Sequence, residues 1–151
     1  MKESQRISGL FSNLYQGEPW IDVTLVGTLQ SISYQKAAEK YKNCNSIWEI
    51  VNHIIAWREN VLQRVQGKVI NTPNHNYFES VHDVSESAWQ TTLDNLAQSQ
   101  QHWMSFLEHC NESEFDAIYP NNGLNYYEHI HGIIQHDTYH LGQIVILSKL
   151  I

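Results

Sequence analysis

Apolar residues recur at three- and four-residue intervals along most of the chain, which is the spacing of a helix buried on one side. The first such stripe predicts a helix over residues 4–16, which ends at Gly17. Shorter helical stretches are expected over residues 23–32 and directly after Ser33. The alternation of apolar and polar residues that is typical of strands does not persist beyond a few positions. The pattern therefore favours an all-α fold.

Three longer helices are predicted in the rest of the chain. Ser46 and Glu49 form an S-x-x-E capping box in front of an apolar run, and Asn125 and Glu128 repeat this arrangement before the last apolar run. Each helix should exceed about 20 residues and measure about 30–40 Å at a rise of 1.5 Å per residue. The three helices are expected over residues 46–66, 85–110 (with residue 83 as an alternative start) and 125–151.

Together with the N-terminal helix, the three long helices predict a four-helix bundle. The chain has 151 residues and a mass of 17.6 kDa, which suits a single domain over residues 1–151. Residues 68–84 form a long loop between two of the helices. In a bundle, such a loop is either a crossover connection or a lid.

Composition and charge exclude several classes of protein. Nine basic and sixteen acidic residues give a formal net charge of −7, which argues against binding to nucleic acid because the phosphate backbone requires a basic face. No apolar run approaches the roughly 20 residues that span a bilayer, and the first residues lack the apolar core of a signal peptide. Cys44 and Cys110 are far apart and are expected to be reduced thiols in the cytoplasm.

The histidines are the unusual feature of the composition, because four of the nine lie in the last quarter of the chain. His136 and His140 are separated by four positions, so both rings lie on one face of the last helix, about 5–6 Å apart at Cβ. His53 lies at the edge of the apolar stripe of a different helix and is the best candidate for a third ligand. Three histidines meeting in a groove suit a metal ion with a water molecule at its fourth position. The alternative is that these are independent surface histidines, since nine of them make chance pairs plausible.

Asp137 and Gln143 are candidates for supporting such a site. Asp137 points into the middle of the apolar stripe, where a carboxylate is costly unless it is paired. One interpretation is that it accepts a hydrogen bond from a ligand histidine on another helix, namely His53. The other is a structural partnership with a Trp N–H, a Tyr hydroxyl or Arg58. Gln143 lies beside the histidine pair and is expected to orient a bound ligand.

Other chemically interesting residues have simpler interpretations. Glu49 is explained by its capping box. His129 lies about two turns before His136, too far to bind the same ion easily; it is expected to be exposed, with a place at the pocket mouth or a contact with substrate as the alternative. The pair lacks the internal glutamate of H-E-x-x-H, so zincin-type protease chemistry is not supported. The tryptophans are expected to be core residues or groove walls, at positions 20, 48, 57, 89 and 103.

The chain resembles the DinB/YfiT-like superfamily, whose members are often described as metal-dependent hydrolases. Three stretches carry the resemblance: Gly-Glu-Pro-Trp at residues 17–20, the block around His53 at residues 46–57, and His-Asp-x-x-His-x-Gly-Gln within residues 134–144. The resemblance implies a four-helix bundle, commonly a homodimer, with a divalent metal held by three histidines. Carried onto this sequence, the ligands are His53, His136 and His140.

The resemblance also implies a class of reaction. Characterised relatives include transferases that use bacillithiol and an isomerase that depends on mycothiol. We therefore expect a metal-dependent enzyme of the hydrolase or thiol-transferase type that uses Zn²⁺ or Ni²⁺ and acts on a small molecule, with a low-molecular-weight thiol as a possible co-substrate. The alternative is a non-catalytic, metal-stabilised bundle that binds a small ligand or a protein.

Overall fold

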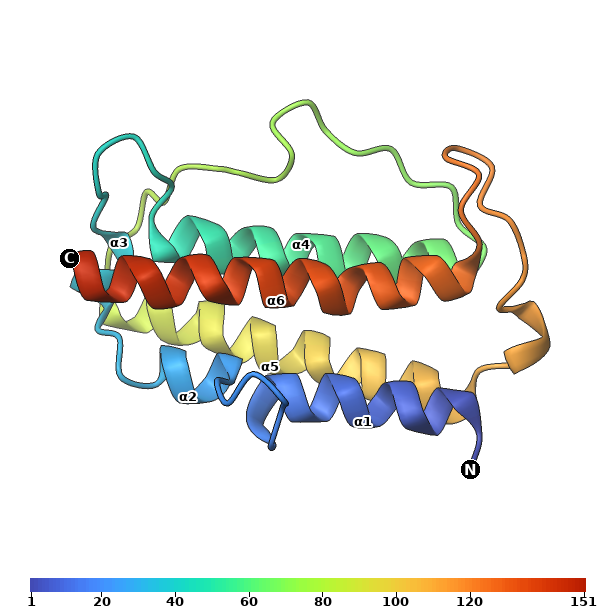
Figure 1. Cartoon of the computed structure of the whole chain (residues 1–151). Coiled ribbons are helices and arrows are strands. Elements are labelled where there is room, and N and C mark those ends of the chain that lie inside the picture. The colour runs from blue at the N-terminus through green and yellow to red at the C-terminus, as the bar shows by residue number, and fades with distance from the viewer.

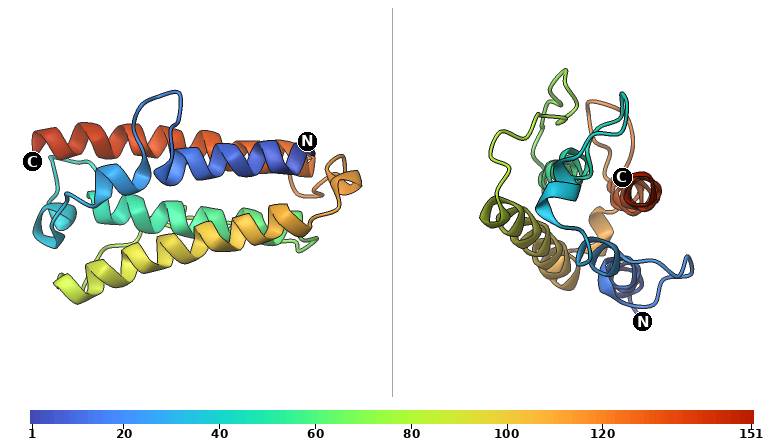
Figure 2. Two further views of the ribbon diagram at one scale, coloured as in Figure 1. Left: turned by 90° about the horizontal axis from the view of Figure 1, so that it is seen from below. Right: turned by 90° about the vertical axis from the view of Figure 1, so that its left-hand side faces the viewer.

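Four long helices form the body of the protein, described here from a computed structural model of residues 1–151 (Figure 1). Two short helices connect the first long helix to the second, and a single 3₁₀ turn precedes the last. The four helices lie at the corners of a square when viewed along their axes (Figure 2), so each packs against two neighbours. The elements are α1 (Glu3–Gln16), α2 (Leu25–Leu29), α3 (Tyr34–Ala38), α4 (Ile47–Val65), α5 (Glu86–His109), η1 (Glu112–Glu114) and α6 (Tyr126–Leu150). The predicted all-α bundle is confirmed.

The direction of the helices explains the long loop. Helices α4 and α5 run the same way along the bundle, so the chain between them returns over the full length of α4 (Figure 1). Residues 68–84 are therefore a crossover connection, which is one of the two predicted alternatives. Helix α6 runs in the opposite direction and lies beside α4, and these two helices share the most extensive helix contact of the bundle.

Both predicted capping boxes are present. The Ser46 hydroxyl accepts a hydrogen bond from the backbone N–H of Glu49, whose carboxylate accepts one from the backbone N–H of Ser46. Asn125 and Glu128 make the same reciprocal pair at the start of α6. Helix α4 has 19 residues, slightly fewer than predicted, because Ser46 and Gln66 cap the helix and lie outside it. The chain then turns away at Gly67, whose φ is 87°.

The core fills the bundle in two clusters of apolar side chains, one toward each end. Trp48, Trp89 and Trp103 are buried in it as predicted, and each indole N–H has a partner. Trp20 is different, because it is 96% exposed in the connection between α1 and α2. The expectation of a core or groove-wall position was wrong there, since helix α2 begins only at Leu25 and leaves the preceding segment outside the bundle. None of the helices is long and apolar enough to span a membrane.

Candidate metal centre

The contact between α4 and α6 brings three histidines together. One ring nitrogen from each of His53, His136 and His140 lies within 4.8 Å of the others. The Nε2 atoms of His53 and His136 are 3.0 Å apart, and the ring centroids of His136 and His140 are 4.4 Å apart. His53 and His140 are buried and His136 is partly exposed, so the cluster lies where the groove between the two helices meets solvent.

The crossover fixes the orientation of His53. The backbone carbonyl of Asn76 lies 2.7 Å from Nδ1 of His53. A carbonyl oxygen can only accept a hydrogen bond, so Nδ1 carries the proton and Nε2 keeps its lone pair. The Phe78 ring stacks on the imidazole at a centroid distance of 3.9 Å, and the Trp57 indole donates to the Asn76 side chain. The lone pair of His53 therefore points toward the other two histidines.

Gln143 fixes the ring of His140, as Asn76 fixes the ring of His53. Nδ1 of His140 donates to the side-chain oxygen of Gln143 across 2.7 Å, one turn further along α6. This leaves Nε2 of His140 as the unprotonated nitrogen in the neutral ring. Gln143 thus lies next to the predicted histidine pair, where its contact is with the ring of His140.

Asp137 pairs with Arg58. Its Oδ2 accepts a hydrogen bond from Nε of Arg58 at 2.7 Å, and both side chains are fully buried. Arg58 also donates to Gln100 and Ser99 on α5, so the pair joins three helices. The predicted alternative of a structural partnership with Arg58 describes this contact. The other alternative, a hydrogen bond to His53, was wrong because Nδ1 of His53 faces the crossover on the outer side of the helix.

The remaining oxygen of Asp137 connects this pair to the cluster. Oδ1 lies 3.6 Å from Nδ1 of His136, and neither atom has a hydrogen-bond partner although both are buried. Nε2 of His53 has no proton, so Nε2 of His136 must supply the proton for their 3.0 Å contact when no cation is present. If a cation binds to Nε2 of His136, the proton of the neutral ring moves to Nδ1. Oδ1 of Asp137 is the nearby acceptor for that proton. The unpaired buried atoms therefore fit a divalent metal with imidazole ligands, such as Zn²⁺ or Ni²⁺.

The protonation of the cluster also suits metal binding. Burial lowers the pKa of His53 from its usual value of 6.5 to about 4, against the opposing effect of the hydrogen bond to Asn76. Burial likewise lowers the pKa of His140. Both rings are therefore neutral at pH 7, which is the form that binds a metal ion.

A pocket of about 720 Å³ opens over the three histidines. Its wall is formed by α4, by the C-terminal half of α6, by the crossover and by the segment after α3. No Asp or Glu lines it. The apolar lining residues are Tyr41, Cys44, Ile50, Trp57, Phe78, Tyr139, Ile146, Leu147 and Leu150.

Two further residues from the sequence analysis lie outside the cluster. Glu49 is held in its capping box and by Lys40 at 2.9 Å, in agreement with its structural interpretation. His129 is only 6% exposed and its Nε2 donates to Asn122, so the expectation of an exposed side chain was wrong. The segment before α6 folds back over this ring, and the helical pattern alone does not reveal that cover.

The sequence reasoning also missed Asn76 and Phe78, which hold His53 from outside the bundle. Neither lies on a helix, so no periodicity identifies them. Asn76 has a φ of 51°, a left-handed conformation that asparagine adopts more readily than most residues. That preference is the one signal in the sequence, and it predicts a turn rather than a contact with histidine.

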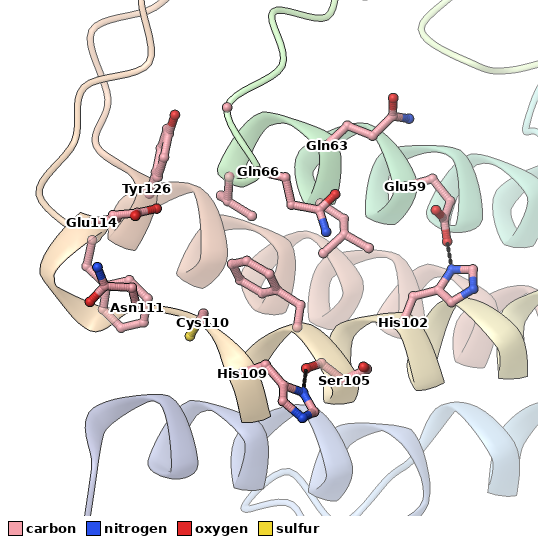
Figure 3. A pocket seen from close by; sticks show the side chains of 15 residues that line it. Glu59, Gln63, Gln66, His102, Ser105, His109, Cys110, Asn111, Glu114 and Tyr126 are labelled. Atoms are coloured by element: carbon pink, nitrogen blue, oxygen red, sulfur yellow. Dashed lines mark hydrogen bonds and ion pairs between the residues drawn. The ribbon is translucent and has the colours of Figure 1, made fainter.

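A second large cavity, of about 860 Å³, lies near the other end of the bundle between α4 and α5 (Figure 3). Its two histidines do not converge. His102 contacts Glu59 at 3.1 Å, and His109 donates to the backbone of its own helix at Ser105. Burial raises the pKa of the Cys110 thiol, which disfavours a thiolate. This cavity therefore does not assemble a reactive group.

Comparison with known proteins agrees with the geometry. A family model described as the DinB superfamily matches residues 24–144, a span that includes all three histidines of the cluster. Neither the curated proteins nor the solved structures contain a match to the chain. The family match covers well over half of the 151 residues and confirms the resemblance that the sequence motifs indicated. The chain belongs to the DinB superfamily.

Proposed function

We propose that the protein is a divalent-metal-dependent enzyme of the hydrolase or thiol-transferase type, with Zn²⁺ or Ni²⁺ held by His53, His136 and His140. The observation that carries the proposal is the orientation of the rings. The Nδ1 protons of His53 and His140 are held by Asn76 and Gln143, so their Nε2 lone pairs are directed into one small space. Preorganised ligands of this kind reduce the entropy lost when an ion binds.

When bound, the ion would supply Lewis acidity that lowers the pKa of a water molecule or a thiol and so provides a nucleophile at neutral pH. The residues of the chain perform the supporting tasks. Asn76 and Gln143 hold the ligand tautomers, and Asp137 would accept a hydrogen bond from Nδ1 of His136 once that nitrogen carries the proton. Phe78 covers one face of His53 and excludes water from that side.

The pocket supports a small molecule as the substrate. Its volume of about 720 Å³ lies within the range of cavities that hold metabolite-sized ligands. Phe78, Ile146 and Leu150 give it an apolar wall suited to a carbon skeleton, and the histidines lie at its base. A low-molecular-weight thiol would fit as the co-substrate in the same space.

A second candidate is a non-catalytic, metal-stabilised bundle that binds a small ligand. The observation that favours it is the absence of any Asp or Glu among the residues that line the pocket. A carboxylate is a common general base in metal-assisted hydrolysis, where a water molecule must lose a proton, whereas a thiol ionises far more readily than water and depends less on such a base. Thiol transfer is for this reason the better match of the two proposed reaction types.

The metal content of variant proteins tests the site. Wild-type protein and the variants His53→Ala, His136→Ala and His140→Ala are loaded with Zn²⁺ or Ni²⁺, desalted and analysed by mass spectrometry of the elements. His82→Ala serves as the control, because His82 is exposed in the crossover and makes no side-chain contact with the cluster. We expect a stoichiometric ion in the wild type and the control and its loss in the other three. Full metal content in all three variants would refute the assignment.

Catalysis is tested separately with the metal-loaded protein. A panel of esters and of electrophiles with added thiols is screened, and each signal is compared with that of the His136→Ala variant. Thiol-dependent turnover that disappears in the variant supports the transferase. A silent screen, combined with a melting temperature that falls on chelation, supports the non-catalytic bundle instead.

A further inference from the structure

A smaller cavity adjoins the candidate metal pocket. It has a volume of about 270 Å³ and lies between the C-terminal half of α4 and the first turns of α6. Trp57 and His136 line both cavities, so the two cavities adjoin at these side chains. The side chains of Arg64 and His129 line the smaller cavity on its far side.

Arg64 is the exceptional residue of this cavity, because it is a buried cation without an acidic partner. The side chain is only 7% exposed, and no carboxylate lies within ion-pair distance. Its guanidinium lies between the rings of Trp57 and Tyr119, at 5.3 and 5.0 Å from their centroids. Nη2 donates to Thr72, while Nε is buried without a partner and Nη1 makes no hydrogen bond.

Arg58, six residues earlier on the same helix, shows what a compensated arginine looks like in this protein. It is also buried, but it has Asp137 as its counter-ion and donates to Gln100 and Ser99. A charge removed from water is costly unless an opposite charge accompanies it. The cation–π contacts of Arg64 with Trp57 and Tyr119 offset only part of that cost.

The positive charge of Arg64 acts on His129, which lines the same cavity. Burial lowers the pKa of His129, and Arg64 is the next largest cause of that shift. Glu128 also lines the cavity, but it is exposed and its carboxylate accepts the backbone N–H of Asn125 in the capping box. Arg64 is therefore the only buried charged side chain that lines the cavity, and Glu128 offsets its charge only from the solvent-exposed rim.

We propose that this cavity binds the oxyanion of a small molecule, a carboxylate or a phosphate, with Arg64 as its counter-ion. Nη1 of Arg64 is the free donor, and the aromatic rings on either side hold the guanidinium in place. The substrate of the candidate metal site then carries an anionic group at one end and its reacting group at the other. This pairing of the two cavities rests on the proposed function, whereas the anion site itself does not.

The cavity has room for such a group. Gly132 lines it from α6, and a Cβ atom added at this position would meet no atom within 4 Å. A volume of about 270 Å³ suits a carboxylate or phosphate with a few attached carbons and is too small for a macromolecule. The open space at Gly132 also allows the cavity to be filled without altering Arg64.

Binding is tested by NMR titration of the chelator-treated, metal-free protein. The signals followed are the Trp57 indole N–H and the ring protons of His129, and the probes are butyrate, butyramide and inorganic phosphate. We expect saturable shifts with butyrate or phosphate and none with butyramide, which has the shape of butyrate without its charge. Tighter binding of butyrate identifies a carboxylate ligand, and tighter binding of phosphate identifies a phosphate ligand. Equal responses to butyrate and butyramide overturn the proposal.

Four variants, one of which is a control, test the proposed role of each part of the cavity. Arg64→Gln should weaken anion binding at least about tenfold, whereas Arg6→Gln, at an exposed arginine of α1, should leave it unchanged. Gly132→Leu should abolish binding by filling the cavity while Arg64 remains in place. Glu128→Gln keeps the capping box and should strengthen binding by about twofold, because it removes a negative charge from the rim. Unchanged affinity in both Arg64→Gln and Gly132→Leu contradicts the proposal.

The design separates the two proposals. The titration contains no metal ion, so its failure would leave the metal assignment intact. Conversely, loss of metal binding in the wild type would leave an anion site measured in this way intact.

Discussion

Two large cavities of the bundle have similar sizes, and both contain histidines, yet only one brings its histidine rings together. In the pocket over His53, His136 and His140, two rings are held by Asn76 and Gln143 so that their lone pairs converge. In the cavity of Figure 3, the ring of His102 contacts Glu59, and the ring of His109 donates to the backbone carbonyl of Ser105. The difference teaches that the orientation of the ring nitrogens distinguishes a candidate metal site, whereas cavity volume and the presence of histidines do not.

The largest expected effect is a loss of stability when the acidic partner of Arg58 or of His102 is removed. Asp137→Ala should destabilise the protein by about 3–5 kcal/mol, because it leaves the buried charge of Arg58 without a counter-ion. Glu59→Ala, which breaks the exposed contact with His102, should cost less than about 1 kcal/mol. Urea unfolding followed by circular dichroism measures both. Similar losses in the two variants would contradict the distinction.

Metal removal should give the next largest effect. With free metal at about one hundred times its dissociation constant, binding should add about 2.7 kcal/mol to the free energy of unfolding. The melting temperature of wild-type protein and of His102→Ala should therefore fall when a chelator is added. His53→Ala should show no such change, and a normal response to chelation in that variant would argue against the site.

A smaller effect is expected from the residue that holds His140. Gln143→Ala leaves all three imidazoles in place but removes the acceptor of the His140 Nδ1 proton. Loss of such a supporting contact typically weakens metal affinity by about 10–100-fold. Competition with a chromogenic chelator measures the change, and His109→Ala provides the matched control from the other cavity. The proposed role of Gln143 fails if the two variants retain equal affinity.

The smallest effect is the pH dependence of the metal-free protein near neutrality. The pKa of His53 is about 4 in the folded protein and close to 6.5 when unfolded, so the unfolded chain binds a proton first as the pH falls. The contribution of His53 to stability is complete above pH 6.5 and is lost progressively between pH 6.5 and 4. Between pH 7 and pH 6 the loss should be below about 1 kcal/mol.

The variant His53→Gln tests the origin of that loss. The decline should become shallower without disappearing, because burial also lowers the pKa of His140 and His129. Denaturant unfolding at a series of pH values provides the measurement. An identical decline in the variant would show that His53 is not its source.

The parts of the fold and site that were predictable from the sequence are those set by local rules. The capping boxes at Ser46 and Asn125 identify the starts of α4 and α6, because capping depends on residues only three positions apart. Helical spacing also places His136 and His140 on one face. The convergence of His53 with them followed from the edges of two apolar stripes, because in a bundle such edges meet at a groove.

The parts that were not predictable depend on chain that is distant or irregular. The partner of Asp137 could be narrowed to a few residues, but the choice of Arg58 depends on how α4 and α6 are rotated against each other. The burial of His129 depends on the turn before α6, and the exposure of Trp20 depends on where α2 begins. The hold of Asn76 on His53 depends on the path of a connection without periodicity.

The pocket is built from two kinds of segment, the helices and the irregular crossover over residues 68–84. The helices supply the imidazoles, whereas Asn76 and Phe78 supply an outer wall of the pocket and belong to no helix. Substitutions in residues 68–84 can therefore reshape what the pocket admits while the packed interior stays the same. Evolution, or a designer, has in this segment a means of changing ligand preference without rebuilding the scaffold.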